Sequence, residues 1–413
     1  MEKFKFIDLF CGIGGFHQAL KTLGGTCVFA SDIDSDCRKT YESNYGITPA
    51  GDITKVNEYE IPDHDLLCGG FPCQAFSKAG KRLGFDDPTK GTLFFDIMRI
   101  VKAKKPKYIL LENVRNLASH DKGNTWKIIY QSISDAGYNV SSEPTIFSPH
   151  MIGIPQHRER VFIMAVRKDI EELPKFVFNR DNNKSCSIYS ILEDDESVDC
   201  KYRISDDEIA LLEHWNKFIQ NVRTVEGKLP SFPIWTECFI SGFWATVDDS
   251  YPNWKRDIMR KNYLLYDNNR EFIDAWLKNG KDNVKLFFGA KAKFEWQAGV
   301  NDSNPDIFKN IIQIRPSGIR VKVGTYFPAL VAIAQIPIVG AKKRMLTPRE
   351  CARLQSFPDT FLYDEKEHQA YKQFGNSVNV DVVKLFAEFL MNLNNTREQY
   401  SWKTQYQTEN ALF

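Results

Sequence analysis

The sequence predicts an α/β fold built on a nucleotide-binding βαβ unit, and three observations support this. Residues 4–10 are apolar and aromatic enough for a buried parallel strand. A glycine turn follows at residues 11–15, and a helical pattern opens at Phe16. Two further apolar runs, residues 26–30 and 107–111, lead into acidic residues. Since ligands of an open α/β sheet bind at the carboxyl ends of its strands, we expect the site at that edge.

The glycine turn and the acids after the strands favour a cofactor that contains adenosine. The turn reads Cys11-Gly12-Ile13-Gly14-Gly15, which departs from the G-x-G-x-x-G fingerprint, so a pyrophosphate is not specifically indicated. Asp32 lies 18 residues after Gly14, near the usual place of a ribose-binding carboxylate. A third acid, Asp52, stands between Gly51 and Ile53. Each signal alone is also typical of ordinary turns, and only their combination indicates a cofactor.

A candidate nucleophile follows the apolar run at residues 66–70. That run ends in two glycines, Pro72 stiffens the backbone, and Cys73 comes next, so a thiol is presented at the tip of a loop. A thiolate is a strong nucleophile. The alternative is a buried, unreactive cysteine, which is the usual fate of this residue type.

An acid and a pair of arginines also lie next to predicted strands, where a site is expected. Glu112 comes directly after the strand at 107–111; the alternative is an ordinary acid at a helix start. Arg158 and Arg160 alternate at the start of the strand 161–166, so they should share one face of the sheet. The alternative for both arginines is a solvated strand end.

Together these motifs resemble the DNA (cytosine-5) methyltransferases, especially the bacterial enzymes of type II restriction–modification systems. The blocks occur in the family's order and cover roughly residues 1–167 and 344–390. They are Asp8–Phe16, Gly51–Ile53, Gly69–Ser77, Gly91–Phe94, Glu112–Val114, Gln156–Arg160, Leu346–Arg353 and Gln373–Val378.

The resemblance implies a Rossmann-like S-adenosyl-methionine-dependent methyltransferase domain with a smaller target-recognition domain inserted in it. We expect the catalytic and cofactor-binding domain to be discontinuous, with residues 1–168 and 372–413, because the block around Asn376 belongs with the cofactor pocket. Residues 169–371 would form the target-recognition domain and hinge. Six of the eight tryptophans lie between Trp215 and Trp296, which predicts a second hydrophobic core there.

By the same resemblance, the substrate is a cytosine rotated out of double-stranded DNA, and Cys73 adds to carbon 6 of its ring. Glu112 would hydrogen-bond ring nitrogen 3, and Arg160 would hold the ring carbonyl oxygen. Arg158 would support the same site or a flanking phosphate. The sequence does not name the base that removes the carbon 5 proton.

The cofactor implied is S-adenosyl-methionine, with S-adenosyl-homocysteine as product and no metal. The glycine turn and Phe16 would hold its methionine end, Asp32 the ribose hydroxyls, and Asp52 the adenine amino group. Ile33 is a departure, since relatives often carry a large aromatic residue there. The expected cofactor-binding set is Phe10, Gly12, Gly14, Gly15, Phe16, Asp32, Ile33, Asp52, Ile53, Pro72, Asn376 and Val378.

DNA contacts are expected from a basic loop beside Cys73, with Lys81 and Arg82, and from the inserted segment. Arg315 and Arg320 flank a proline–glycine turn and suit bidentate contact with guanine, although contact with phosphate alone is equally open. The inserted segment offers these candidates: Arg256, Arg260, Lys261, Asn262, Gln313, Arg315, Ser317, Arg320 and Lys322.

The composition of the chain argues against several other classes of protein. The net charge of the 413-residue chain is +1, so DNA binding has to come from a local basic face. Nine cysteines without a C-x-x-C pair indicate neither a zinc site nor a disulfide framework, and favour a reducing cytoplasm, which the resemblance implies is bacterial. No signal peptide or membrane-spanning run is evident. The resemblance further implies a monomer, and it leaves open whether a paired restriction endonuclease acts on the same site.

Three alternatives stay open at this point. A dinucleotide-dependent enzyme would share the opening βαβ unit, but it does not explain Cys73, Glu112 and the arginine block together. A catalytically silent DNA-binding relative would not need the complete catalytic set. A transfer-RNA cytosine-5 methyltransferase of the same family is the nearest alternative, and the large aromatic insert favours a site-specific DNA enzyme over it.

Overall fold

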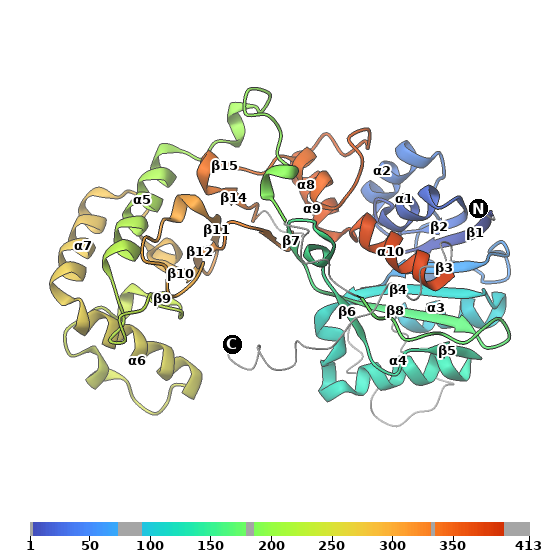
Figure 1. Cartoon of the computed structure of the whole chain (residues 1–413), viewed down its shortest axis with the longest axis horizontal. Coiled ribbons are helices and arrows are strands. Elements are labelled where there is room, and N and C mark those ends of the chain that lie inside the picture. The colour runs from blue at the N-terminus through green and yellow to red at the C-terminus, as the bar shows by residue number, and fades with distance from the viewer. Residues whose placement is uncertain (1–2, 73–92, 179–185, 332–334, 392–413) are drawn as a thin grey trace. The chain divides into compact units, whose positions relative to one another are not determined.

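The computed structural model describes residues 3–72, 93–178, 186–331 and 335–391 (Figure 1). Contacts divide the chain into two compact units. The first unit draws mainly on residues 1–186 and 351–413, and the second on residues 187–330 and 334–350. Each unit has a hydrophobic core of its own.

The first unit is built on a seven-stranded sheet in the order β2-β1-β3-β4-β8-β5, with β6 also paired to β8. The strands β1 to β4 pair in parallel, whereas β8 runs antiparallel to its three neighbours. Four carboxyl ends therefore meet at one edge. The strands are β1 (Phe4–Leu9), β2 (Gly25–Ser31), β3 (Leu66–Gly70), β4 (Tyr108–Val114), β5 (Tyr138–Val140), β6 (Thr145–Phe147) and β8 (Arg160–Arg167); a short strand, β7, covers Gln156–His157.

Helices cover both faces of this sheet. On one face, apolar side chains of α3 and α4 share a buried cluster with Ile7, Leu67 and Ile109 of the strands. On the other face, α10 contacts α1, β4 and β8. The ring of Phe386 stacks on that of Phe162, with the ring centroids 4.3 Å apart. The helices are α1 (Gly15–Thr22), α2 (Ser35–Tyr45), α3 (Leu93–Lys104), α4 (Asn124–Asp135), α8 (Pro348–Leu354), α9 (Glu367–Asn376) and α10 (Val380–Met391). Short 3₁₀ helices are η1 (Ile53–Lys55), η3 (Arg115–Ala118), η4 (His120–Gly123) and η5 (Pro149–Ile152).

The second unit combines a six-stranded sheet, in the order β15-β14-β11-β12-β10-β9, with three α-helices. Its strands are β9 (Ile234–Trp235), β10 (Lys293–Gln297), β11 (Ile311–Arg315), β12 (Gly318–Lys322), β14 (Ile338–Val339) and β15 (Arg344–Met345), and β13 covers Phe327–Pro328. Its helices are α5 (Asp206–Asn221), α6 (Asn253–Asn268) and α7 (Arg270–Asn283), and its 3₁₀ helices are η6 (Ile188–Ser190), η7 (Cys200–Tyr202), η8 (Thr236–Cys238), η9 (Phe243–Thr246), η10 (Gly289–Ala292), η11 (Ile307–Lys309) and η12 (Gly340–Lys342).

The tryptophan-rich stretch supplies much of the second core. Trp215, Trp276 and Trp296 are buried in it, and Trp215 stacks on Phe294 at 4.8 Å. Trp254 is an exception, because 63% of its surface is exposed. None of the helices that the structure describes is long and apolar enough to cross a membrane.

The contact division differs from the predicted domain boundaries at both ends of the insert, and residues 169–186 fall in the first unit. Residues 351–371, which the sequence assigned to the recognition domain and hinge, pack within the first unit. The main-chain N–H of Val380 donates to the carbonyl of Gln355 at 3.0 Å, and the side chain of Asn379 donates to Leu354. These hydrogen bonds join the segment to the start of α10, which lies against the first sheet.

Candidate active site

The glycine turn lies at the carboxyl end of β1, and backbone geometry explains its composition. Gly12 and Gly14 have φ angles of +52° and +86°, in the left-handed region that favours glycine. A Cβ on Gly14 would lie 2.3 Å from the ring of Tyr45, and one on Gly15 would lie 2.6 Å from Val378. A Cβ on Gly12 would meet nothing within 4 Å. The turn is therefore packed from behind and open at Gly12, where a ligand could approach the backbone.

Two flanking phenylalanines of the predicted cofactor set are partly or fully buried. Phe10 has a φ of +55° and packs against the core of the first unit. Phe16 is 3% exposed, and its ring lies 3.9 Å from the position a Cβ would take on Gly70. Both rings thus border the ends of β1 and β3.

Asp32, which follows β2, is hydrogen-bonded to the glycine turn. Its carboxylate accepts hydrogen bonds from the main-chain N–H groups of Gly12 and Asp34, each at 2.8 Å. Burial raises the pKa of Asp32, and these two hydrogen bonds oppose that effect. The neighbouring Ile33 is apolar and 75% exposed.

Arg38 is a residue that the sequence reasoning missed. Its Nη1 donates to the carbonyl oxygens of Asp32 at 2.9 Å and Ile33 at 3.2 Å, and so holds the loop after β2. The same nitrogen lies 3.6 Å from the Cβ position of Gly51. Its place on the first turn of a helix after an acidic loop is the only sequence signal for this role.

Asp52 caps the short helix η1, where its side chain accepts from the main-chain N–H and the hydroxyl of Thr54 at 3.0 and 2.8 Å. These bonds lower the pKa of Asp52. Ile53 differs from its neighbour, because its side chain is 4% exposed and belongs to the core of the first unit. Of these two residues, Asp52 presents a polar side chain at the turn and Ile53 anchors the turn in the core.

Glu112 lies at the same edge, near the end of β4, and is 8% exposed. The Nε of Arg160 lies 2.9 Å from its Oε1. Burial raises the pKa of Glu112, and the charges of Arg160 and Arg158 oppose the rise. Gly70 pairs with Glu112 across β3 and β4, and a Cβ there would lie 3.4 Å from its Oε2. Glycine at this position leaves room at the carboxyl.

Arg158 is almost fully buried, with 3% of its surface exposed. Its Nη2 donates to the carbonyl oxygens of Gly375 at 2.9 Å and Ser377 at 3.0 Å. Burial lowers the pKa of this guanidinium to about 9. Of its two expected roles, this geometry favours support of the site over contact with a DNA phosphate.

The structure brings three of the four predicted catalytic residues together. Glu112, Arg158 and Arg160 line one small cavity of about 10 Å³, together with Val378. Asn376, expected to close the cofactor pocket, is exposed at the end of α9. Cys73 lies outside the described residues, as do Lys81 and Arg82.

The segment that leads to Cys73 is described up to Pro72. Phe71 is buried, Pro72 is exposed, and the side-chain amide of Asn113 donates to the carbonyl of Phe71 at 2.9 Å. Asn113 follows Glu112 in β4, so one strand both carries the acid and holds the start of the Cys73 segment. The sequence placed Asn113 in a motif but gave it no role.

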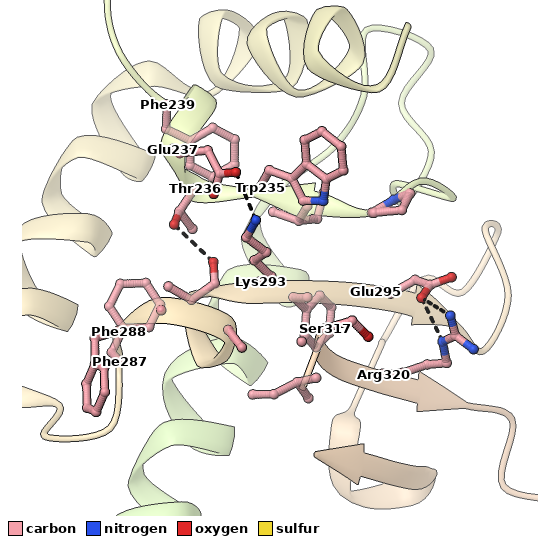
Figure 2. A pocket seen from close by; sticks show the side chains of 18 of the residues that line it. Trp235, Thr236, Glu237, Phe239, Phe287, Phe288, Lys293, Glu295, Ser317 and Arg320 are labelled. Carbon is pink, nitrogen blue, oxygen red and sulfur yellow. Dashed lines mark hydrogen bonds and ion pairs between the residues drawn. The ribbon is translucent and has the colours of Figure 1, made fainter. Parts of the chain in front are cut away.

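The candidate DNA contacts of the second unit have different surroundings. Asn262 is fully buried, and its amide bonds to the main chain at Trp235 and Pro233, so the expectation that it reads bases is wrong. Arg256 forms an ion pair with Asp249. Three candidates, Arg315, Ser317 and Arg320, line a hollow of about 1070 Å³ (Figure 2). The Nη2 of Arg315 donates to the hydroxyl of Ser317 at 3.0 Å. Lys261 instead pairs with Asp257 at 2.8 Å.

Residues 4–392 match the family described as C-5 cytosine-specific DNA methylase. The chain belongs to this family. Curated relatives of these methylases include the type II methyltransferase M.AluI of Cellulosimicrobium cellulans, 33% identical over 92% of this chain and 91% of the relative. M.HhaI of Haemophilus parahaemolyticus is 32% identical over 93% of each chain. M.HpaII of Haemophilus parainfluenzae is 35% identical over 93% of this chain and 88% of the relative.

Solved structures agree at the level of the fold. A Spodoptera frugiperda DNMT2 variant covers 94% of this methylase, with a TM-score of 0.53 and 19% identity, and 99% of that chain is matched. A methyltransferase of Entamoeba histolytica covers 95%, with a TM-score of 0.53, 17% identity and 99% of that chain matched. The predicted Rossmann-like fold, the family and the class of enzyme, a DNA cytosine-5 methyltransferase, are thereby confirmed. The dinucleotide-enzyme alternative is wrong.

Proposed function

We propose that this methylase uses S-adenosyl-methionine to methylate carbon 5 of a cytosine within one short sequence of double-stranded DNA. The relatives named as type II methyltransferases support a role in protecting host DNA beside a paired restriction endonuclease. The single observation that carries the proposal is the buried pair of Glu112 and Arg160, 2.9 Å apart, next to the end of the strand that leads to Cys73.

The cofactor fits the edge formed by the glycine turn. Gly12 leaves an open approach to the backbone, and Asp32 offers a carboxylate that the turn already orients. Ile33 offers an exposed apolar surface, and Asp52 offers an acceptor beside it. These residues would hold the methionine end, the ribose and the adenine in that order. When bound, S-adenosyl-methionine supplies an electrophilic methyl group, and S-adenosyl-homocysteine leaves.

The residues near Glu112 supply the activation of cytosine. Carbon 5 of cytosine is a weak nucleophile until the thiolate of Cys73 adds to carbon 6, which moves electron density onto carbon 5 and nitrogen 3. Glu112 holds a proton at nitrogen 3, and its raised pKa keeps that proton available. Arg160 would stabilise charge on the ring oxygen.

The remaining steps restore the ring. After carbon 5 accepts the methyl group, a base removes its proton, the carbon 5–carbon 6 double bond re-forms, and the sulfur of Cys73 leaves. Because carbon 6 is inaccessible in a stacked duplex, the target base rotates out of the helix before the thiolate adds. The enzyme acts as a monomer in the bacterial cytoplasm.

Methyl transfer to genomic DNA tests this function. The full-length chain is incubated with unmethylated genomic DNA and S-adenosyl-methionine, and 5-methylcytosine is mapped at single-base resolution. We expect methylation at one short recurring sequence, and none with Cys73→Ser. Methyl transfer to transfer RNA but not to DNA in parallel reactions would contradict the proposal.

A further inference from the structure

One face of the sheet in the second unit is polar and carries excess positive charge. Alternate residues of β10, β11 and β12 point into the core, and their neighbours lie on the opposite face. The core-side residues are Phe294, Trp296, Ile312, Ile319 and Val321. We call the other side the polar sheet face, formed by Lys293, Glu295, Gln313, Arg315, Arg320 and Lys322.

Arg320 is at the centre of the polar sheet face. Strand register places Glu295 beside it on β10 and Gln313 beside it on β11. Both Nε and Nη2 of Arg320 lie 2.6 Å from the same oxygen of Glu295, and Figure 2 shows the two side chains joined by these contacts. One edge of the guanidinium is thus fixed by a carboxylate. Among the described residues Nη1 has no partner, so the outer edge keeps donors for a ligand.

The cations of the polar sheet face are held close to one another. Burial lowers the pKa of Lys322, and the charges of Arg320 and Arg315 lower it further. The pKa of Arg315 is lowered by burial and by Arg320, and its buried Nε has no hydrogen-bond partner in the described part of the chain. Like charges held together on a rigid sheet raise the free energy of the unit; Glu295 offsets part of this repulsion, and acceptor groups of a ligand would offset more.

We propose that Arg320, positioned by Glu295, reads a guanine of the DNA target through the major groove. The two donors on the outer edge of the guanidinium match the O6 and N7 acceptors of guanine. Glu295 favours a base over a phosphate, because a carboxylate beside the arginine would repel a phosphate but not the neutral edge of a base. The proposal rests on the proposed function and adds one base to its specificity.

The test compares two variants with two matched controls. Arg320→Lys removes the bidentate fork, and Glu295→Gln removes its charged support. Arg270→Lys and Asp267→Asn make the same changes in another Arg–carboxylate pair of this unit, 2.6 Å apart and outside the sheet. Each full-length protein methylates a library of duplexes with randomised bases around cytosine, and sequencing gives the preference at every position.

At one position, we expect the wild-type preference for guanine to fall about tenfold or more in Arg320→Lys, with preferences elsewhere kept. Glu295→Gln should show a smaller loss at the same position, and both controls should keep the wild-type pattern. An equal loss on all sequences would indicate a phosphate contact, and an unchanged pattern in Glu295→Gln and Arg320→Lys would indicate a structural ion pair. Either result overturns the inference.

Failure of the inference is distinguishable from failure of the proposed function. If the wild-type protein methylates no cytosine in DNA, the proposed function itself is wrong. If wild type methylates a defined sequence and the two variants keep its preference, only the assignment of Arg320 falls. Thermal unfolding of each variant shows whether it is folded, and Glu295→Gln, which keeps the side-chain shape, carries the test if Arg320→Lys is unstable.

Discussion

The protonation of a single buried carboxyl decides how this active site could work. Glu112 is 8% exposed beside Arg160, so burial and the arginine charge act on its proton in opposite directions. Burial has the larger effect and raises the pKa of Glu112. Glu112 therefore keeps its proton, which the proposed mechanism places at ring nitrogen 3, to a higher pH than an ordinary glutamate does.

Replacing Glu112 tests this role directly. Glu112→Gln cannot deliver a proton, so we expect methyl transfer to fall by about 10²- to 10⁴-fold, with binding of S-adenosyl-methionine unchanged. Because the acid form of Glu112 is the active one, the wild-type rate should fall as pH rises through its raised pKa, and the variant should lack that fall. Transfer of labelled methyl groups, followed across a series of buffers from acidic to alkaline pH, measures both effects.

Arg38 offers a second prediction at this scale. Its guanidinium bonds to the carbonyls of Asp32 and Ile33, so Arg38→Ala should loosen the loop that holds the cofactor. We expect the Kd for S-adenosyl-methionine to rise about tenfold, as for the loss of one charge-assisted hydrogen bond, with DNA affinity unchanged. Lys39→Ala is the control, because Lys39 is exposed and pairs with Asp36 instead. Equal calorimetric affinities for the two variants would contradict the assignment.

At the scale of elements, the glycine turn between β1 and α1 allows the effect of a positive φ angle to be distinguished from the effect of a side chain on ligand binding. Gly12 and Gly24 both have positive φ angles, +52° and +87°, and a Cβ on either would meet nothing within 4 Å. They differ in place, because Gly12 lies beside Asp32 and Gly24 follows α1. The two positions therefore form a matched pair.

Alanine at these two positions should give similar stability and different binding. Gly12→Ala and Gly24→Ala should each lower the free energy of unfolding by about 1–2 kcal/mol, because alanine is strained at positive φ. Only Gly12→Ala should weaken binding of S-adenosyl-methionine, since only that methyl group would occupy the cofactor's approach. Urea unfolding and calorimetry give the two quantities, and equal cofactor affinity in both variants would count against the turn as the binding site.

Much of the candidate site at the carboxyl edge of the first sheet could be predicted from the sequence. Strands, glycine turns and the residues that follow them are local features of the chain. Asp32 and Glu112 lie where the ends of their strands require. The bonds of Arg158 to Gly375 and Ser377 could not be predicted this way, since the partners are more than 200 positions apart in the sequence. The prediction that Asn262 reads bases is wrong for a similar reason, because α6 turns its side chain inward onto main-chain groups, and residue type does not reveal that contact.

At the scale of the whole molecule, the second unit has its own core and its own closing contacts. Glu350, the last residue of this unit, is fully buried. Its two carboxylate oxygens accept hydrogen bonds from Nη2 and Nη1 of Arg344 at 2.7 and 2.9 Å. The main-chain N–H groups of Thr347 and Glu193 also donate to it, each at 2.9 Å. These bonds join two stretches of chain, at Glu193 and at residues 344–350, which is consistent with a unit that ends near Glu350 and not near residue 371.

Exchange of this unit tests its role in recognition. A chimera that carries residues 187–350 from a relative such as M.HhaI should methylate the relative's sequence in place of the native one. The expected reason is that base contacts lie in this unit and the chemistry lies in the first. Single-base mapping of 5-methylcytosine measures the change, and a folded, active chimera that keeps the native preference would show that recognition lies elsewhere.

The bonds between Arg158 and residues 375–377 also have a consequence for synthesis on the ribosome. Translation delivers Glu112 and Arg158 early, but Gly375 and Ser377 emerge only after the entire second unit. A nascent chain therefore contains Glu112 and Arg158 long before the residues that Arg158 bonds to, Gly375 and Ser377, have been synthesised. Catalytic competence is withheld until translation is nearly finished, so prematurely terminated products should be inert on DNA.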